Sequence, residues 1–215
     1  MDAVATADVE FWDARYEGEN YAYGTEPNAY FRQRLDALPP GRLLLLAEGE
    51  GRNAVYAAKR GWQVTAVDFS DEARAKAQRL AVAQGVHLDY HVADLTTLAW
   101  LRPGHYNAVG LVYAHFAPAD RRAVHAAAAA SLAPGGHLIL EAFSPRQLGL
   151  PSGGPRTAEM LYQPALLAED FAGLALLENY ELGVVLHEGS CHAGPANVVR
   201  LLATRDSTAE LTYSI

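Results

Sequence analysis

The alternation of short apolar runs with longer helical patterns is the feature that most constrains how this chain can fold. Residues 42–47 form a nearly continuous apolar run, which is typical of a strand covered on both faces. Helical patterns follow this run and most of the later apolar runs. Such an alternation predicts parallel strands that are joined by right-handed helical crossovers. The other strands expected from this alternation are 63–68, 87–92, 106–113 and 137–143, and the helices between them are 53–60, 71–84 and 119–132.

The C-terminal part breaks this alternation. Two β-rich runs, residues 175–186 and 196–205, have only a turn between them. A parallel return would need a crossover, so these strands are predicted to pair antiparallel. The expected fold is α/β: a Rossmann-like, mostly parallel, seven-stranded sheet with an antiparallel C-terminal hairpin and helices on both faces.

No linker is long enough to divide the 215 residues, so residues 1–215 are expected to form a single domain. Residues 1–40 read as an N-terminal helical cap beside the carboxyl end of the first strand, where ligands bind in such sheets. Residues 144–164 are rich in Gly and Pro and are expected to form a lid loop, because loops of this length are uncommon without a function.

Charge and composition exclude several classes of function. The net charge is -8 and the only lysines are Lys59 and Lys76, which argues against a nucleic-acid partner. No apolar run is long enough to cross a bilayer, and residues 1–10 do not resemble a signal peptide. The single cysteine, Cys191, excludes a disulfide framework, so a cytoplasmic location is expected.

Small residues directly after the first strand predict a close approach of the backbone to a ligand. Ala47, Gly49 and Gly51 stand at the start of the next helix, where backbone N–H groups are free to donate. Asp68 ends the second strand, and a carboxylate there is placed to accept the two hydroxyl groups of a ribose. The alternative for Asp68 is a helix cap, and for the glycines it is packing alone.

The turn after the third strand adds a third element. Asp94 and the backbone of Leu95 are placed to read the amino group and ring nitrogen of an adenine, or Asp94 is an ordinary turn residue. The carboxyl ends of consecutive strands converge on one crevice.

The third glycine of a dinucleotide turn is replaced by Ala54, and no Tyr-x-x-x-Lys pair exists, which disfavours a nicotinamide-dependent oxidoreductase.

The combined runs 43–53, 64–70, 93–95 and 132–136 resemble class I S-adenosylmethionine-dependent methyltransferases. Runs at 12–16, 23–28, 48–53 and 188–194 resemble the tellurite-resistance and thiopurine methyltransferase-like branch of these enzymes. The chain departs from the commonest pattern twice. Leu45 stands where an acid usually ends the first strand, and Ala47 replaces the first glycine.

The resemblance implies S-adenosylmethionine as cofactor, S-adenosylhomocysteine as product and a small-molecule methyl acceptor. It assigns the methionine portion to the turn after the first strand, where Glu48 would supply the missing carboxylate, and the ribose and adenine to the next two strand ends. Two N-terminal tyrosines would close over the cofactor or only staple their loop. The implied cofactor-binding residues are Tyr21, Tyr23, Ala47, Glu48, Gly49, Gly51, Asn53, Asp68, Phe69, Ser70, Asp94, Leu95 and Tyr113.

The methyl acceptor decides whether a general base is needed. A thiolate or a selenium or tellurium anion needs none, whereas a hydroxyl or an amine does. His115, after the fourth strand, and His192, in the terminal hairpin turn, are the candidate bases, with structural roles as the alternatives. His187, Cys191 and His192 are too close together in sequence to surround one ion, so no metal site is expected.

The nucleophilic atom and the oligomeric state are left open by these residues. A non-catalytic module that binds S-adenosylmethionine or another nucleoside on the same fold is the main alternative, because a fold does not fix a function.

Overall fold

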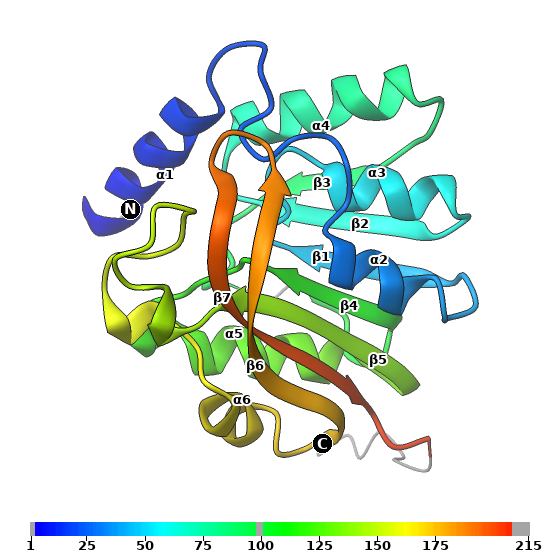
Figure 1. Cartoon of the computed structure of the whole chain (residues 1–215). Helices are drawn as coiled ribbons and strands as arrows, with labels where there is room; N and C mark the ends of the chain where they lie inside the picture. The colour runs from blue at the N-terminus through cyan, green and yellow to red at the C-terminus, as the bar shows by residue number, and fades with distance from the viewer. Residues whose placement is uncertain (1–2, 98–100, 208–215) are drawn as a thin grey trace.

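The computed structural model describes residues 3–97 and 101–207. It contains a seven-stranded sheet with the strand order β3-β2-β1-β4-β5-β7-β6 (Figure 1). Strands β1 to β5 pair parallel, and β7 runs antiparallel between β5 and β6. The prediction of a mostly parallel sheet with an antiparallel C-terminal hairpin is therefore confirmed. The strands are β1 (Arg42–Leu46), β2 (Gln63–Asp68), β3 (Asp89–Val92), β4 (Tyr106–Val112), β5 (Leu132–Phe143), β6 (Ala175–Glu188) and β7 (His192–Thr204).

Helices cover both faces of this sheet (Figure 1). The α-helices are α1 (Ala3–Tyr16), α2 (Ala29–Leu35), α3 (Arg52–Lys59), α4 (Asp71–Ala83), α5 (Pro118–Ser131) and α6 (Pro164–Asp170). Alternate residues of β1 point to opposite faces, as the pleat requires. Leu43 and Leu45 join the core cluster under α2, α3 and α4, whereas Leu44 and Leu46 join the cluster under α5 and α6. The apolar run of β1 thus serves two cores.

Several strand boundaries differ from the predicted ones. The fifth strand was expected to begin at residue 137, but β5 begins at Leu132, which pairs with Tyr106 before the register shifts past the Pro-Gly-Gly turn. The terminal strands are also longer than expected, because β6 and β7 stay paired up to Glu188 and His192. His192 is therefore the first residue of β7 and not part of the turn, which is a correction to its predicted place.

Residues 144–164, predicted as a lid loop, contain two short 3-10 turns, Pro145–Gln147 and Ala158–Met160. Gln147 is buried and donates to the Ser152 hydroxyl at 2.9 Å and to the carbonyl of Gly153 at 3.0 Å. It also accepts from the backbone of Asn197 in β7, so this segment is fastened to the hairpin. In the described part of the chain, no helix is both long and apolar enough to span a membrane.

Gly51 sets the distance between α3 and α4. It has φ +88°, and a Cβ there would lie 2.5 Å from the Cβ of Ala77 in α4. Gly85 has φ +69° but nothing within 4 Å of its added Cβ, so it is a matched control for backbone strain. We expect Gly51→Ala to lower the free energy of unfolding by about 2 kcal/mol more than Gly85→Ala does in urea titrations. Equal losses would contradict this packing.

Candidate functional site

Two strained residues mark the carboxyl edge of the sheet at its centre. Among the described residues, Ala47 (φ 52°) and Tyr113 (φ 54°) are the non-glycine residues with positive φ. They directly follow β1 and β4, the neighbouring strands from which the chain proceeds to opposite sides of the sheet. Strain of this kind collects at functional sites, and ligands of open α/β sheets bind at this switch point. Both residues belong to the predicted set.

Asp68 lies beside the glycine turn, as predicted. Its buried carboxylate accepts the backbone N–H of Gly49 at 2.9 Å and that of Ser70 at 3.1 Å. Burial raises the pKa of Asp68 to about 6, although the hydrogen bond from Gly49 opposes the shift. The Tyr16 hydroxyl of α1 also faces this turn, since a Cβ on Gly49 would lie 2.9 Å from it. The turn, β2 and the N-terminal helix thus meet at one place.

Glu48 has a structural task in the same turn. Its buried carboxylate accepts the N–H of Ala54 at 2.7 Å and contacts the side-chain amide of Asn53 at 3.5 Å. The first N–H groups of a helix lack intrahelical partners, so Glu48 caps α3. Burial raises the pKa of Glu48 to about 7, against the effect of the Ala54 hydrogen bond. Its predicted contact with a ligand, and that of Asn53, stay predictions.

The residues predicted to hold an adenine lie at the ends of β2 and β3. Asp94 is exposed, and its carboxylate accepts the N–H and the hydroxyl of Thr96 at 2.8 and 2.7 Å. Leu95 is buried in the core cluster under α5, and Phe69 is half-buried. The turn role of Asp94 is therefore present, and the adenine contacts stay predictions.

Glu50 fastens the N-terminal loop to the glycine turn. Its carboxylate accepts the N–H groups of Ala22 at 3.1 Å and Tyr23 at 3.3 Å, and it pairs with the buried ammonium of Lys76 at 2.7 Å. The Tyr21 hydroxyl donates to the backbone carbonyl of Lys76 at 3.1 Å. This geometry favours the stapling role for Tyr21. The N-terminal loop is held over the site by a buried ion pair.

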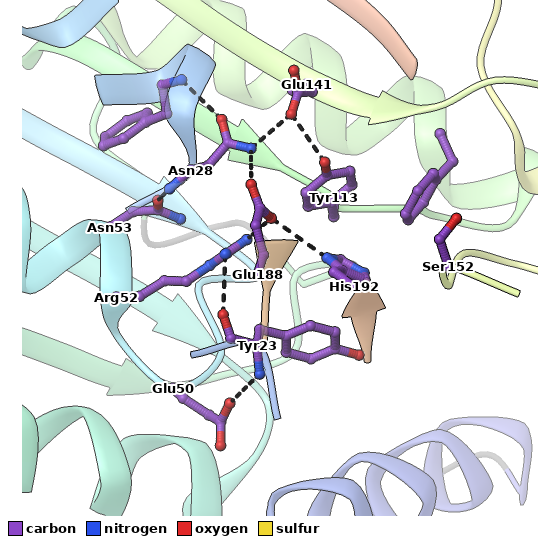
Figure 2. Close-up of polar contacts among 12 residues, drawn as sticks. Tyr23, Asn28, Glu50, Arg52, Asn53, Tyr113, Glu141, Ser152, Glu188 and His192 are labelled. Carbon is purple, nitrogen blue, oxygen red and sulfur yellow. Dashed lines mark hydrogen bonds and ion pairs between the residues drawn. The ribbon is translucent and has the colours of Figure 1, made fainter. Parts of the chain in front are cut away.

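A polar junction lies next to this loop and consists of Asn28, Arg52, Glu141 and Glu188. Figure 2 shows the Asn28 amide between the two carboxylates, with Nδ2 at 2.6 Å from Glu141 and 3.0 Å from Glu188. Arg52 donates to Glu188 at 2.8 Å and to the carbonyl of Tyr23 at 3.2 Å. The junction connects the N-terminal loop, α3, β5 and β6.

Neither Glu141 nor Glu188 was predicted as a site residue, although Glu188 begins one of the runs that carry the resemblance. Glu141 also accepts Arg200 at 2.5 Å and the Tyr113 hydroxyl at 3.0 Å, so it supports one of the strained residues directly. The available signal for Glu141 was a lone acid in the apolar run 138–143. For Glu188 the signal was its place at the start of the run 188–194.

His192 is enclosed by an aromatic cluster of Tyr23, Tyr113 and Phe143. The centre of its ring lies 4.5 Å from the rings of Tyr23 and Tyr113 and 5.2 Å from that of Phe143. Burial lowers the pKa of His192, and the Glu188 carboxylate opposes that effect. The structure therefore places three predicted residues, Tyr23, Tyr113 and His192, in one contact group. The catalytic role of His192 stays a prediction.

His115 has a different environment. Its Nδ1 lies 2.7 Å from the carbonyl oxygen of Met160, and its Nε2 accepts the N–H of Phe143 at 3.2 Å. The carbonyl requires the proton on Nδ1 and the N–H requires the lone pair on Nε2, so both ring nitrogens are engaged. Burial lowers the pKa of His115 to about 4. This geometry favours the structural alternative over the predicted base, which stays untested.

No group of three or more His, Cys, Asp or Glu side chains in the described ranges has an arrangement that could hold a metal ion. Cys191 is a half-buried free thiol at the hairpin tip.

The raised pKa of Glu48 predicts a pH-dependent effect on stability. Because the folded-state pKa of about 7 exceeds the ordinary value of 4.5, the unfolded chain releases this proton first, and stability falls as the pH rises between these values. Glu48→Gln removes that loss, so we expect its stability relative to wild type to increase by up to about 3 kcal/mol from pH 4.5 to pH 8. Urea titrations at both pH values measure this, with exposed Glu72→Gln as control. A pH-independent difference would contradict the burial of an acid here.

Comparisons of sequence find that part of the chain is similar to known methyltransferases. Residues 43–136 match the family model of a methyltransferase domain. The ubiquinone biosynthesis O-methyltransferase of Xanthomonas campestris pv. campestris (strain B100) is 33% identical over 143 residues, which cover 65% of this chain and 59% of that protein. The corresponding protein of Xanthomonas euvesicatoria pv. vesicatoria (strain 85-10) is 31% identical over 143 residues, with the same shares covered. This chain thus spans about three fifths of the length of these curated relatives.

Solved structures share the fold at low identity. A protein studied for the conversion of a disulfide bond into a thioacetal group during echinomycin biosynthesis has a TM-score of 0.73 and 22% identity, covering 94% of this chain and 93% of its own. TehB from Haemophilus influenzae has a TM-score of 0.69 and 14% identity, covering 92% and 67%. Magnesium protoporphyrin IX methyltransferase from Synechocystis PCC 6803 has a TM-score of 0.64 and 19% identity, covering 94% and 99%. The chain thus shares the Rossmann-like fold of these solved structures, and residues 43–136 are similar to a methyltransferase domain.

Proposed function

We propose that this protein is an S-adenosylmethionine-dependent methyltransferase that acts on a small-molecule acceptor and releases S-adenosylhomocysteine. The observation that carries the proposal is the group of Ala47, Gly49, Asp68 and Tyr113 at the switch point of the sheet, within a segment that matches a methyltransferase domain. The relatives named as O-methyltransferases support it. The domain match argues against the nicotinamide alternative.

The residues of this edge fit such a cofactor. Asp68 presents a buried carboxylate beside the backbone of Gly49, which suits ribose hydroxyl groups. The faces of Tyr23 and Tyr113 suit a sulfonium, which aromatic rings attract by about 0.5–2 kcal/mol. Bound S-adenosylmethionine would supply a methyl group already activated by positive sulfur. The remaining cofactor contacts inferred from the sequence are part of this proposal.

The task of the chain is then alignment and exclusion of water. Holding an acceptor in line with the methyl group can contribute several kcal/mol, up to roughly 7–11 in favourable cases. The aromatic cluster gives rigid walls, and Gln147 holds residues 144–164 against the hairpin, as a lid would require. We assign residues 1–40 as the cap and 144–164 as the lid of a single domain spanning 1–215.

We place the protein in the tellurite-resistance and thiopurine methyltransferase-like branch. The support is that the runs 23–28, 48–53 and 188–194, which carry that resemblance, supply Asn28, Arg52 and Glu188 to the polar junction. The likeness of the fold to TehB agrees with this placement. The nucleophilic atom of the acceptor is a separate question.

Replacing Asp68 tests the cofactor assignment. Asp68→Asn keeps an acceptor oxygen but removes the charge, and we expect S-adenosylhomocysteine to bind roughly 10- to 150-fold more weakly, as for a lost charge-assisted hydrogen bond of about 1.5–3 kcal/mol. Titration calorimetry measures this. The exposed Asp71→Asn is the matched control, and melting curves of both variants check the fold. Equal affinity of wild type and a folded Asp68→Asn protein would refute the assignment.

A further inference from the structure

Glu188 has a largely buried carboxylate, 13% exposed, to which the function proposed above gives no task. It ends β6, and its two oxygens are held from two other elements. Oε1 accepts the Asn28 amide at 3.0 Å, and Oε2 accepts the Arg52 guanidinium at 2.8 Å. Burial alone would raise the pKa of Glu188, but the contacts with His192 and Arg52 outweigh it and lower the pKa below its usual range. The side chain is therefore a fixed negative charge.

This charge faces one nitrogen of His192. Nδ1 of the imidazole lies 3.6 Å from Oε2 of Glu188, across the hairpin tip (Figure 2). Nδ1 is buried and has no hydrogen-bond partner at hydrogen-bond distance among the described residues, so this carboxylate is the charged acceptor that it faces. A separation slightly above hydrogen-bond length is common before substrate binds and shortens in the complex. The carboxylate favours the tautomer with the proton on Nδ1.

The other nitrogen faces the lid. A Cβ on Gly153 would lie 3.1 Å from Nε2 of His192 and 2.7 Å from its Cδ2, and Gly153 has φ +109°. A side chain is thus excluded at the point where the lid passes the ring. With the proton on Nδ1, Nε2 carries an unshared lone pair toward the lid segment.

We propose that Glu188 is a positioning residue that orients His192, so that Nε2 removes the proton of a phenol-type hydroxyl on the methyl acceptor. This rests on the proposed function and specifies its substrate class. A thiolate needs no base. A neutral amine attacks through its own lone pair and gives its proton to a base only afterwards, whereas a hydroxyl has to lose its proton to become a strong nucleophile. A phenol, with a pKa near 10, gives up its proton to an imidazole more readily than an aliphatic alcohol does.

The step balances without a further reactant. The O–H bond of the acceptor breaks and its proton goes to Nε2, while the oxygen electron pair forms the new bond to the methyl carbon. The bond between that carbon and the sulfonium breaks, and its electron pair stays on sulfur. The imidazolium that results faces Glu188, whose charge compensates it, as in triads where a carboxylate orients a histidine. The positive charges of Arg52 and Arg15 act in the opposite direction and lower the pKa of His192.

The tautomer of His192 is the direct test and needs no acceptor. In protein labelled with ¹⁵N-histidine, long-range ¹H–¹⁵N spectra distinguish Nδ1–H from Nε2–H, and His192→Gln assigns the signals. We expect Nδ1–H in wild type, a shift to Nε2–H in Glu188→Ala, and recovery of Nδ1–H in Glu188→Gln, whose amide oxygen still accepts. A wild-type His192 with its proton on Nε2 would overturn the proposal.

Turnover tests the substrate class. With catechol and thiophenol as probes, we expect wild type to methylate catechol, and Glu188→Ala and His192→Gln each to lower the ratio of catechol to thiophenol turnover roughly 100-fold through kcat. The double variant should lose no more than either single one. Methylation of thiophenol alone, or an unchanged ratio in Glu188→Ala, would overturn it. Binding of S-adenosylhomocysteine by each variant separates these results from a failure of the proposed function.

Discussion

The sharing of one amide by two carboxylates, one buried and one largely buried, is the interaction on which the functional edge depends. Glu141 and Glu188 come from different strands, and Asn28 donates to both of them while its oxygen caps α2 through the N–H of Phe31. Arg52 and Arg200 balance the two charges. Unpaired buried charges are costly, and breaking such a pair typically costs about 3–5 kcal/mol. The elements at this edge are therefore fixed relative to one another.

Two consequences follow for the site. Glu141 holds the hydroxyl of Tyr113, so the strained residue after β4 is stabilised from the next strand. Glu50, which is paired with Lys76, likewise stabilises the loop that carries Tyr23 by accepting its backbone N–H. Buried ion pairs, and not flexible loops, therefore hold the aromatic cluster around His192 in position. Such support keeps reacting groups in a fixed geometry.

Local patterns predicted the fold well, because strand and helix periods and the turn between the last strands are encoded over short stretches. The proximity of Gly49 and Asp68 was also predictable, since Asp68 ends β2 and Gly49 lies in the turn after the neighbouring parallel strand β1. The polar junction could not be predicted from local patterns. Glu141 finds Arg200 through the register of β5 on β7, and Asn28 and Glu188 lie at opposite ends of the chain. The orientation of His115 depends on Met160, 45 residues further along the chain, which no local pattern reveals.

The most direct measurement is calorimetric titration of the wild-type chain with S-adenosylmethionine and S-adenosylhomocysteine, with NADH as the control. The account predicts that both sulfur nucleosides bind with micromolar affinity and that NADH gives no heat of binding. Absence of binding by both sulfur nucleosides would contradict it and would mean that the departures at Leu45 and Ala47 mark a site that has lost its cofactor.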